Sequence, residues 1–311
     1  TMRSHTDVPM SAMWDHRRED GPFASHWADL RGAASVAHIY GRPYAAAESM
    51  TSALAPWAYG PAYLKRIVDL EFSNGINRPV IHTSVHQPSN DHRPGLSLSI
   101  FGQYFNRHET WAQMARPWVD YLSRNAFMLQ QGRNVADIAY FHGEEAPLTA
   151  LYAHGVPDDL PAQNGWDFIN PRALLEETRV EDGVVVTTGG ARYHAVFLGG
   201  TSRRMSLPVL SRLAELAEQG ATIIGLPPER TPGLARADQP ALCPPRSGRA
   251  TGLFPQQSAR SCGGIRRLVS RWRRGGTIVE PGNGRNRTFA AGPPSGPQPD
   301  CPVDAGRRCL F

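Results

Sequence analysis

Residues 61–88, PAYLKRIVDLEFSNGINRPVIHTSVHQP, contain a helix pattern, a turn and a strand pattern in succession. Apolar side chains recur at helical spacing in the first half, at Leu64, Ile67, Val68 and Phe72. An Asn-Gly turn at 74–75 follows, and residues 78–85 (RPVIHTSV) predict a strand. A helix that leads directly into a buried strand is typical of a parallel βα unit.

The segments on both sides of this unit continue the alternation. Upstream, residues 24–38 predict a helix and residues 43–48 (PYAAAE) predict a short strand. Downstream, residues 108–132 predict a long helix, which Pro117 should kink or divide. We therefore expect an α/β protein whose residues 1–132 form the C-terminal part of a (β/α)8 catalytic barrel.

A second domain is predicted for residues 133–236. Its expected strands are NVADIAYF, YHAVFLGG and ATIIGL, at 134–141, 193–200 and 221–226. An amphipathic helix is predicted for residues 206–220, and a small hairpin insertion for residues 178–193. This pattern predicts a small flavodoxin-like α/β layer domain.

The composition changes sharply in the last part of the chain. Residues 240–311 hold twelve arginines and three acidic residues, a net charge of +9, so the rest of the chain carries −4 of the total +5. All four cysteines lie in this part, all eleven histidines lie outside it, and 21 of its 72 residues are Gly or Pro. We predict that residues 237–311 form a disordered or out-of-frame tail, because this composition buries little apolar area. A basic arm that binds nucleic acid, and a zinc or disulfide module, fit this part less well.

Other classes are disfavoured by the whole sequence. There is no apolar stretch long enough to cross a membrane, and residues 1–10 (TMRSHTDVPM) lack the pattern of a signal peptide. We expect no nucleic-acid or membrane partner and no organic cofactor.

Polar side chains stand where the predicted strands end. Glu48 ends YAAAE, the second group is His82, Ser84, His86 and Gln87, and Glu144 and Glu145 follow a third strand. The carboxyl ends of parallel strands converge on a crevice, and two carboxylates there are the minimum for acid–base hydrolysis of a glycosidic bond. The alternative for each glutamate is a helix cap or a salt bridge.

The histidines and tryptophans allow simpler explanations as well. Four residues along a strand span about 13 Å, which is too far for His82 and His86 to bind one metal ion, so zinc is disfavoured. Four tryptophans are expected in the core, although an aromatic ring at a strand end can also stack on a sugar; they are Trp14, Trp57, Trp111 and Trp118. On these grounds a sugar or other polyol is a plausible substrate.

Several segments in order resemble glycoside hydrolase family 106, the α-L-rhamnosidases. They include HTDVP (5–9), AASVAHIYGRPYAAAES (33–49), residues 61–88, PGLSLSIFGQYFNRHETW (94–111), MLQQGRNVADIAYFHGEEAP (128–147), GWDFINPRALL (165–175) and RYHAVFLGGTSRRMSLPVL (192–210). The resemblance covers about 230 residues and stops near residue 235. A related barrel glycosidase of the β-galactosidase kind, or a truncated, inactive carbohydrate-binding product, are the alternatives.

The resemblance implies an inverting, calcium-assisted hydrolysis of terminal α-L-rhamnosyl residues by two glutamates. It assigns Glu48 as general acid, and Glu144 as general base or as the ligand of calcium and sugar hydroxyls. The side chains that it places around the sugar are Asn77, Arg78, His82, His86, Gln87 and Trp111.

Two features depart from the family pattern. Pro171 stands where similar sequences often carry an acidic residue, and only about 130 residues of the chain resemble a barrel that needs about 250. We therefore expect a fragment of a longer enzyme, with apolar sheet faces exposed, whose full-length form is periplasmic or extracellular.

Overall fold

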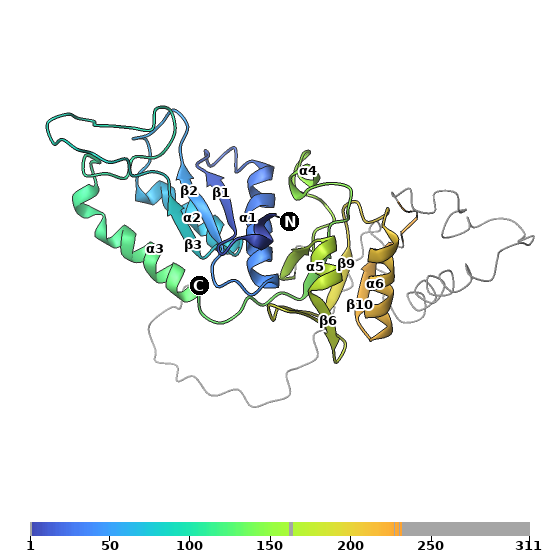
Figure 1. The fold of residues 1–311 in the computed structure, drawn as a ribbon. Helices are drawn as coiled ribbons and strands as arrows, with labels where there is room; N and C mark the ends of the chain where they lie inside the picture. The colour runs from blue at the N-terminus through green and yellow to red at the C-terminus, as the bar shows by residue number, and fades with distance from the viewer. Residues whose placement is uncertain (1, 162–163, 227, 230, 232–311) are drawn as a thin grey trace, which may run out of the picture. The chain divides into compact units, whose positions relative to one another are not determined.

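The computed structural model describes residues 2–161, 164–226, 228, 229 and 231, which belong to one compact unit. Strands in this part of the chain form two parallel sheets and one small antiparallel sheet (Figure 1). The mixed α/β architecture with parallel sheets is therefore confirmed. The predicted tail and all four cysteines lie outside the described residues.

The first sheet contains three parallel strands in chain order. They are β1 (Met10–Trp14), β2 (Ala46–Thr51) and β3 (Arg78–Ile81). Helix α1 (Ala24–Ile39) connects the first two strands, α2 (Pro61–Ser73) connects the next two, and α3 (Arg116–Leu129) follows a short 3-10 turn, η2 (Ala112–Met114). A second 3-10 turn, η1 (Met2–His5), precedes β1. The sheet thus consists of three consecutive βα units.

One face of this sheet is covered by helices and the other is open. On the covered face, Met13 and Ala47 pack with Leu30 of α1 and Ile67 of α2. The strand registers place Met10, Glu48 and Val80 on the opposite face. Met10 and Val80 are 40% and 42% exposed there, so these two apolar side chains of the open face remain in contact with solvent.

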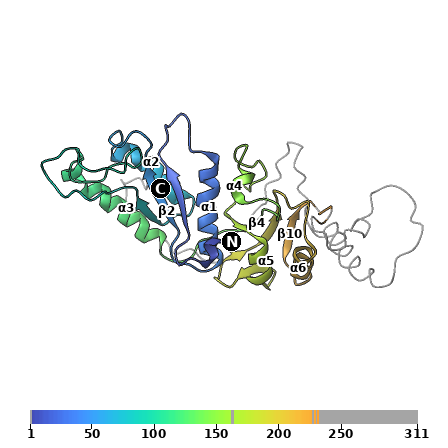
Figure 2. The same ribbon diagram turned by 45° about the horizontal axis from the view of Figure 1, so that its top comes forward.

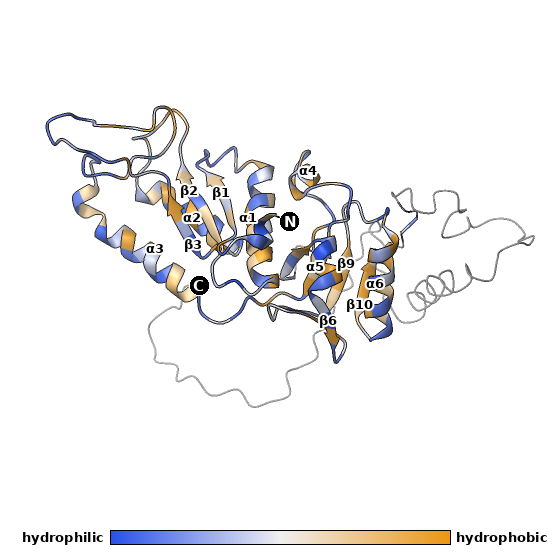
Figure 3. Cartoon of the chain, viewed as in Figure 1, coloured by the Kyte–Doolittle hydropathy of each residue, from blue (hydrophilic) through white to orange (hydrophobic). Residues whose placement is uncertain are grey.

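The second sheet is parallel and has the strand order β10-β9-β4-β5. Its strands are β4 (Ile138–Phe141), β5 (Trp166–Ile169), β9 (Ala195–Leu198) and β10 (Thr222–Gly225), with helices α4 (Leu148–Leu151), α5 (Pro171–Glu176) and α6 (Leu207–Glu218). Leu210, Leu213 and Leu216 of α6 pack on Val196 and Ile223. Figure 3 shows hydrophobic residues along the side of α6 that faces β9 and β10, which is why this amphipathic segment folds as a helix on the sheet.

Helix α1 also packs against the second sheet. Ala28 and Trp27 share a cluster with Leu148 of α4 and Phe168 of β5. Both ribbon views accordingly show α1 between the first sheet and α4 (Figure 1 and Figure 2). The boundary proposed at residue 132 thus divides the sequence, but α1, which precedes it, packs extensively against α4 and β5, which follow it.

The predicted hairpin is present as a three-stranded antiparallel sheet. It contains β6 (Thr178–Glu181), β7 (Val184–Thr187) and β8 (Arg192–Tyr193). Asp182 and Gly183 form its first turn, both with positive φ, as a tight two-residue hairpin requires.

The structure corrects several predicted elements. The strand predicted at 78–85 ends at Ile81, because Thr83 pairs with Gln103 and Phe105 of a returning loop rather than with β2. The long helix begins only at Arg116, because Pro117 in its first turn divides it from the preceding segment. The strand predicted at 43–48 is Ala46–Thr51.

Strands β1 and β5 were missed. Both are short, although the Asn-Gly pair at 164–165 and the Asn-Pro pair at 170–171 are turn signals that could have marked β5. Among the described residues, no helix is long and apolar enough to cross a membrane.

Candidate active site

Glu48 lies on the open face of the first sheet, in its central strand. Its side chain is half-buried, and its Oε1 accepts a hydrogen bond from Thr51 Oγ1 at 2.5 Å. Strand β2 is hydrogen-bonded to β1 on one side and to β3 on the other, so two ladders hold the backbone that carries Glu48. This is a rigid support for a reactive carboxylate.

Strand β2 departs from regular geometry beside Glu48. Met13 pairs with Ser49 while Trp14 pairs with Thr51, so Met50 is the extra residue of a β-bulge. Met50 has a φ of 66° and a fully buried side chain. A non-glycine residue in this region costs on the order of 1–3 kcal/mol and is most often found at functional sites.

Aromatic and imidazole side chains lie near Glu48. Trp14 is on the same sheet face, with its ring centroid 6.4 Å from that of His26 and 5.7 Å from that of Phe101. Burial lowers the pKa of His26, while the charges of Asp29 and Glu48 oppose this shift. A neutral imidazole and an indole ring beside a carboxylate suit the binding of an uncharged polar ligand.

The end of β1 adds a second carboxylate that sequence reasoning missed. Asp15 follows Trp14, and its N–H donates to the Thr51 carbonyl at 2.8 Å. Burial raises the pKa of Asp15, against the opposing effects of a hydrogen bond from Tyr59 and the charge of Arg66. Burial and the nearby Asp15 raise the pKa of Tyr59 to about 12, so its hydroxyl stays protonated. The alternation in MSAMWDH, with Asp-His at its end, was the signal that could have revealed this strand and its polar terminus.

The Arg66 guanidinium bonds two neutral acceptors at this edge. It donates to the His16 carbonyl and, at 2.9 Å, to Tyr63 Oη, and it stacks 4.6 Å from the Tyr63 ring centroid. It therefore holds the loop that follows β1 against α2.

Glu144 lies in the loop that follows β4 and caps a helix. Its Oε2 accepts from the Ser206 N–H at 2.5 Å and its Oε1 from Ser206 Oγ at 2.8 Å, immediately before α6. Glu48 lies in the first sheet and Glu144 in the loop after β4, and the hydrogen bonds of the two carboxylates go to different partners. The capping alternative is therefore the one that the geometry favours for Glu144.

The same contacts bear on calcium. Both Glu144 oxygens already accept hydrogen bonds at the positive end of a helix, and neighbouring Glu145 is paired with Arg204 at 3.2 Å. No group of three His, Cys, Asp or Glu side chains suited to a metal occurs among the described residues. The donors around Glu144 do not fit a calcium ion, and we derive no step from one there.

Replacing Glu144 by alanine is expected to lower the free energy of unfolding by about 0.5–2 kcal/mol, the usual cost of losing a helix cap. Urea denaturation measures this loss, with Glu145→Ala as the control because Glu145 pairs with the exposed Arg204. Unchanged stability combined with a loss of hydrolysis above tenfold would instead favour the catalytic assignment.

Asn77 and Arg78 lie at the amino-terminal edge of the first sheet. Asn77 Oδ1 accepts from the Ala45 N–H at 2.9 Å and its Nδ2 donates to the Pro43 carbonyl at 3.0 Å, which ties the starts of β2 and β3 together. The Arg78 guanidinium lies 4.9 Å from the ring centroid of Tyr44. This edge is opposite the carboxyl ends of the strands, where residues of parallel sheets serve stability more often than catalysis.

The remaining predicted residues lie in the loop after β3 or in the core. His82 follows the strand end directly, and its Nδ1 is buried without a hydrogen-bond partner. His86 is exposed, so the predicted alternating face of His82 and His86 does not form. Gln87 is buried and bonds its own loop, accepting from the Leu96 N–H at 2.9 Å and donating to the Leu96 carbonyl at 2.6 Å. Trp111 packs edge-to-face on Phe105 at 5.7 Å, as expected for a core residue.

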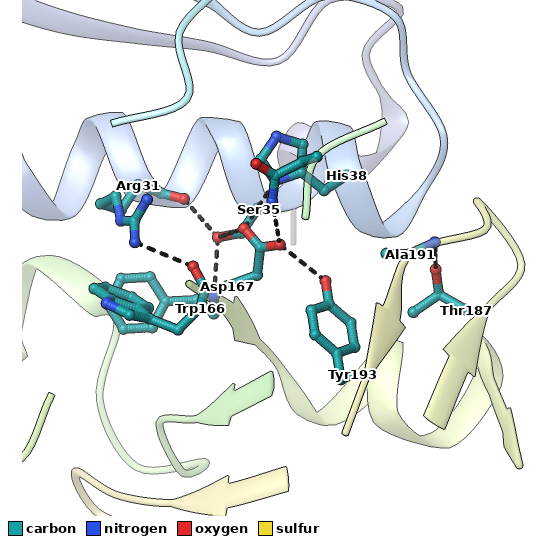
Figure 4. A network of polar contacts seen from close by, with 10 residues as sticks. Arg31, Ser35, His38, Trp166, Asp167, Thr187, Ala191 and Tyr193 are labelled. Atoms are coloured by element: carbon teal, nitrogen blue, oxygen red, sulfur yellow. Dashed lines mark hydrogen bonds and ion pairs between the residues drawn. The ribbon is translucent and has the colours of Figure 1, made fainter. Parts of the chain in front are cut away.

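A second polar network connects α1 to the second sheet (Figure 4). Asp167 of β5 is fully buried; its Oδ1 accepts from His38 Nδ1 at 2.8 Å and Ser35 Oγ at 3.1 Å, and its Oδ2 from Tyr193 Oη at 3.0 Å. Burial alone would raise the pKa of Asp167, but the charge and hydrogen bond of His38, together with Arg31 and Tyr193, lower it below its ordinary value.

This network contains the residue types of a nucleophilic triad without its connectivity. Ser35 Oγ is bonded to Asp167 and to the Phe168 N–H, at 2.9 Å, rather than to the imidazole. Since a triad needs the nucleophile–base hydrogen bond, we assign the Asp167 network a structural role. It fixes α1, and with it β1 and β2, to β5.

The described part of the chain thus presents the Glu48 carboxylate on the open face of a parallel sheet, near Trp14 and His26, with Asp15 following Trp14 at the end of β1. This equipment is typical of the glycoside hydrolases.

The comparisons with known proteins agree with this class. The family model of glycoside hydrolase 106, described as alpha-L-rhamnosidase, matches residues 1–243. The chain belongs to this family. The match extends eight residues past the point near 235 at which the sequence resemblance was expected to stop.

The chain is similar to two further proteins. A solved structure of a rhamnosidase from Novosphingobium sp. PP1Y is 49% identical, with a TM-score of 0.78 over 88% of this chain and 24% of that chain. A Formosa agariphila protein named "Putative beta-glucuronidase" is 38% identical over 200 residues, which are 64% of this chain and 17% of that protein. The chain thus spans about a quarter or less of the length of these relatives.

Proposed function

We propose that this chain is part of an enzyme that hydrolyses terminal α-L-rhamnosyl residues of glycans by an inverting acid–base mechanism. The observation that supports this most directly is Glu48, a carboxylate anchored by Thr51 on an open sheet face in a chain 49% identical to a rhamnosidase. In this proposal Glu48 is the general acid, which protonates the departing glycosidic oxygen.

The proposed fold is a (β/α)8 barrel followed by a flavodoxin-like domain. Three consecutive βα units whose helices cover one face are one arc of such a barrel, and the exposed Met10 and Val80 lie on what would be its inner face. If β4, β5, β9 and β10 are numbered 1 to 4 along the chain, the strand order of the second sheet is 2-1-3-4. The flavodoxin strand order, 2-1-3-4-5, begins in the same way.

The second carboxylate of the acid–base pair is not Glu144 in this proposal, because both of its oxygens are engaged by Ser206. The whole protein is the relevant enzyme, since the chain spans 24% of the solved rhamnosidase. Asp15, which follows β1 and whose N–H bonds the Thr51 carbonyl of β2, is suited to bind a sugar hydroxyl with Tyr59.

The name of the curated relative raises β-glucuronide as a second substrate class. A glucuronide carries a carboxylate, whereas rhamnose is an uncharged deoxy sugar. The Trp14 indole and the His26 imidazole, whose pKa burial lowers, suit an uncharged ligand beside Glu48. The site described above therefore favours a rhamnoside.

Aryl glycosides test this choice. We expect the full-length protein to hydrolyse 4-nitrophenyl α-L-rhamnoside with a kcat/KM at least about 100-fold above those for the β-D-glucuronide and the β-D-galactoside, a discrimination of about 2.7 kcal/mol. Proton NMR of the first sugar released would report inversion. A preference for the glucuronide, or release of galactose, would contradict the proposal.

A further inference from the structure

The β-bulge in β2 reverses the faces of the two residues that follow Ser49. In a regular strand residues 48 and 50 share one face and residue 51 takes the other. Here Met50, with φ 66°, turns its side chain into the cluster formed by Leu64, Val68 and Trp118 on the helix-covered face. Thr51 consequently pairs with Trp14 on the open face, beside Glu48.

Thr51 is fixed in this position from two directions. Its side chain is within hydrogen-bond distance of Glu48, with 2.5 Å between Thr51 Oγ1 and Glu48 Oε1, and the residue is 1% exposed. Its carbonyl accepts from the Asp15 N–H at 2.8 Å, which fixes the backbone at the end of β1 and β2. The hydroxyl therefore meets the carboxylate as a rigid donor.

We propose that Thr51 is a positioning residue for Glu48 and that the bulge at Met50 serves to deliver it; this inference rests on the proposed function. Anchoring Oε1 restricts rotation of the carboxyl group and directs Oε2 toward the open face. A proton donor must lie about 2.6–3.2 Å from the atom that it protonates, and a misplacement of about 1 Å can cost 100-fold in rate. In this proposal, the positive φ of Met50 places Thr51 where its hydroxyl can bond Glu48.

Two substitutions separate the hydroxyl from the shape of the side chain. Thr51→Val keeps the branched shape and removes the donor, and we expect kcat for 4-nitrophenyl α-L-rhamnoside to fall about 10- to 100-fold with KM within about threefold. Thr51→Ser keeps the donor and is expected to stay within about threefold of the wild type. Thr178→Val is the matched control, since Thr178 Oγ1 makes a comparable buried hydrogen bond, 2.7 Å to the Leu174 carbonyl, away from the first sheet.

A second measurement does not depend on turnover. The rate at which a water-soluble carbodiimide labels Glu48, followed by peptide mass spectrometry, should rise severalfold in Thr51→Val because Oε1 is released, and should not change in Thr51→Ser or Thr178→Val. Equal labelling of Thr51→Val and wild type, or faster labelling with unchanged kcat, would overturn the positioning role. A wild type that hydrolyses no rhamnoside but shows the labelling difference would contradict the proposed function while confirming the contact.

Discussion

Replacing Glu48 by glutamine is expected to lower kcat for rhamnoside hydrolysis by about 10²- to 10⁴-fold, the usual contribution of a general acid or base. The amide has nearly the same shape and can still accept the Thr51 hydrogen bond, so the change removes the transferable proton and little else. Because Glu48 is only half-buried, thermal unfolding should stay close to that of the wild type. Steady-state kinetics on the full-length protein measures the effect.

The leaving group of the substrate distinguishes an acid from a base at this position. If Glu48 is the general acid, Glu48→Gln should lose much less activity on a 2,4-dinitrophenyl rhamnoside than on the 4-nitrophenyl rhamnoside, because the better leaving group needs less protonation. If Glu48 is the general base, both substrates should suffer alike, and added azide should restore turnover. Glu145→Gln is the control, since its partner Arg204 is on the surface, and activity of Glu48→Gln within tenfold of wild type would contradict either role.

That Glu48 lies in a strand could be predicted from local patterns, but the strand was expected to end at Glu48 and β2 continues to Thr51. Small residues precede Glu48 in a short strand, and the helix–turn–strand alternation around residues 61–81 identifies a parallel sheet. The partners of Glu48 could not be predicted in the same way. The bulge at Met50 depends on long-range packing with α2 and α3, and nothing in the local sequence, which lacks glycine there, indicates a positive φ.

The polar residues assigned to sugar binding show the opposite difficulty. Asn77 and Gln87 occur in a distinctive segment, yet each is used by the backbone of its own neighbourhood. A polar side chain that organises a turn or a loop gives the same sequence pattern as one that binds a ligand. The two cases differ in whether the polar atoms already bond their own neighbourhood, as those of Asn77 and Gln87 do, and sequence spacing does not report these bonds.

The second large effect is expected from Asp167→Asn, which should lower the free energy of unfolding by about 3–5 kcal/mol. Removing one partner of a buried ion pair leaves the other partner buried without an opposite charge, which strongly destabilises the fold. Here His38 and Tyr193 both donate to a carboxylate that is 2% exposed, and Asn can replace only one acceptor oxygen. Chemical denaturation followed by tryptophan fluorescence measures the loss. Glu181→Gln is the control, because its ion pairs with Arg179 and Arg192 are exposed, and no measurable change is expected.

The pH dependence of this effect has a defined sign. The pKa of Asp167 is lowered in the folded protein by His38, Arg31 and Tyr193 acting against burial, so the folded state binds its proton less readily than the unfolded chain. Its contribution to stability is therefore fully present above the unfolded pKa, about 3.9, and is lost as the pH falls through the lower folded value. The difference in unfolding free energy between wild type and Asp167→Asn should be constant from about pH 5 upward as far as Asp167 is concerned, and should shrink below pH 4. A difference that grew on acidification would mean that Asp167 is protonated in the native protein, and the network that joins α1 to β5 would then be held by neutral hydrogen bonds.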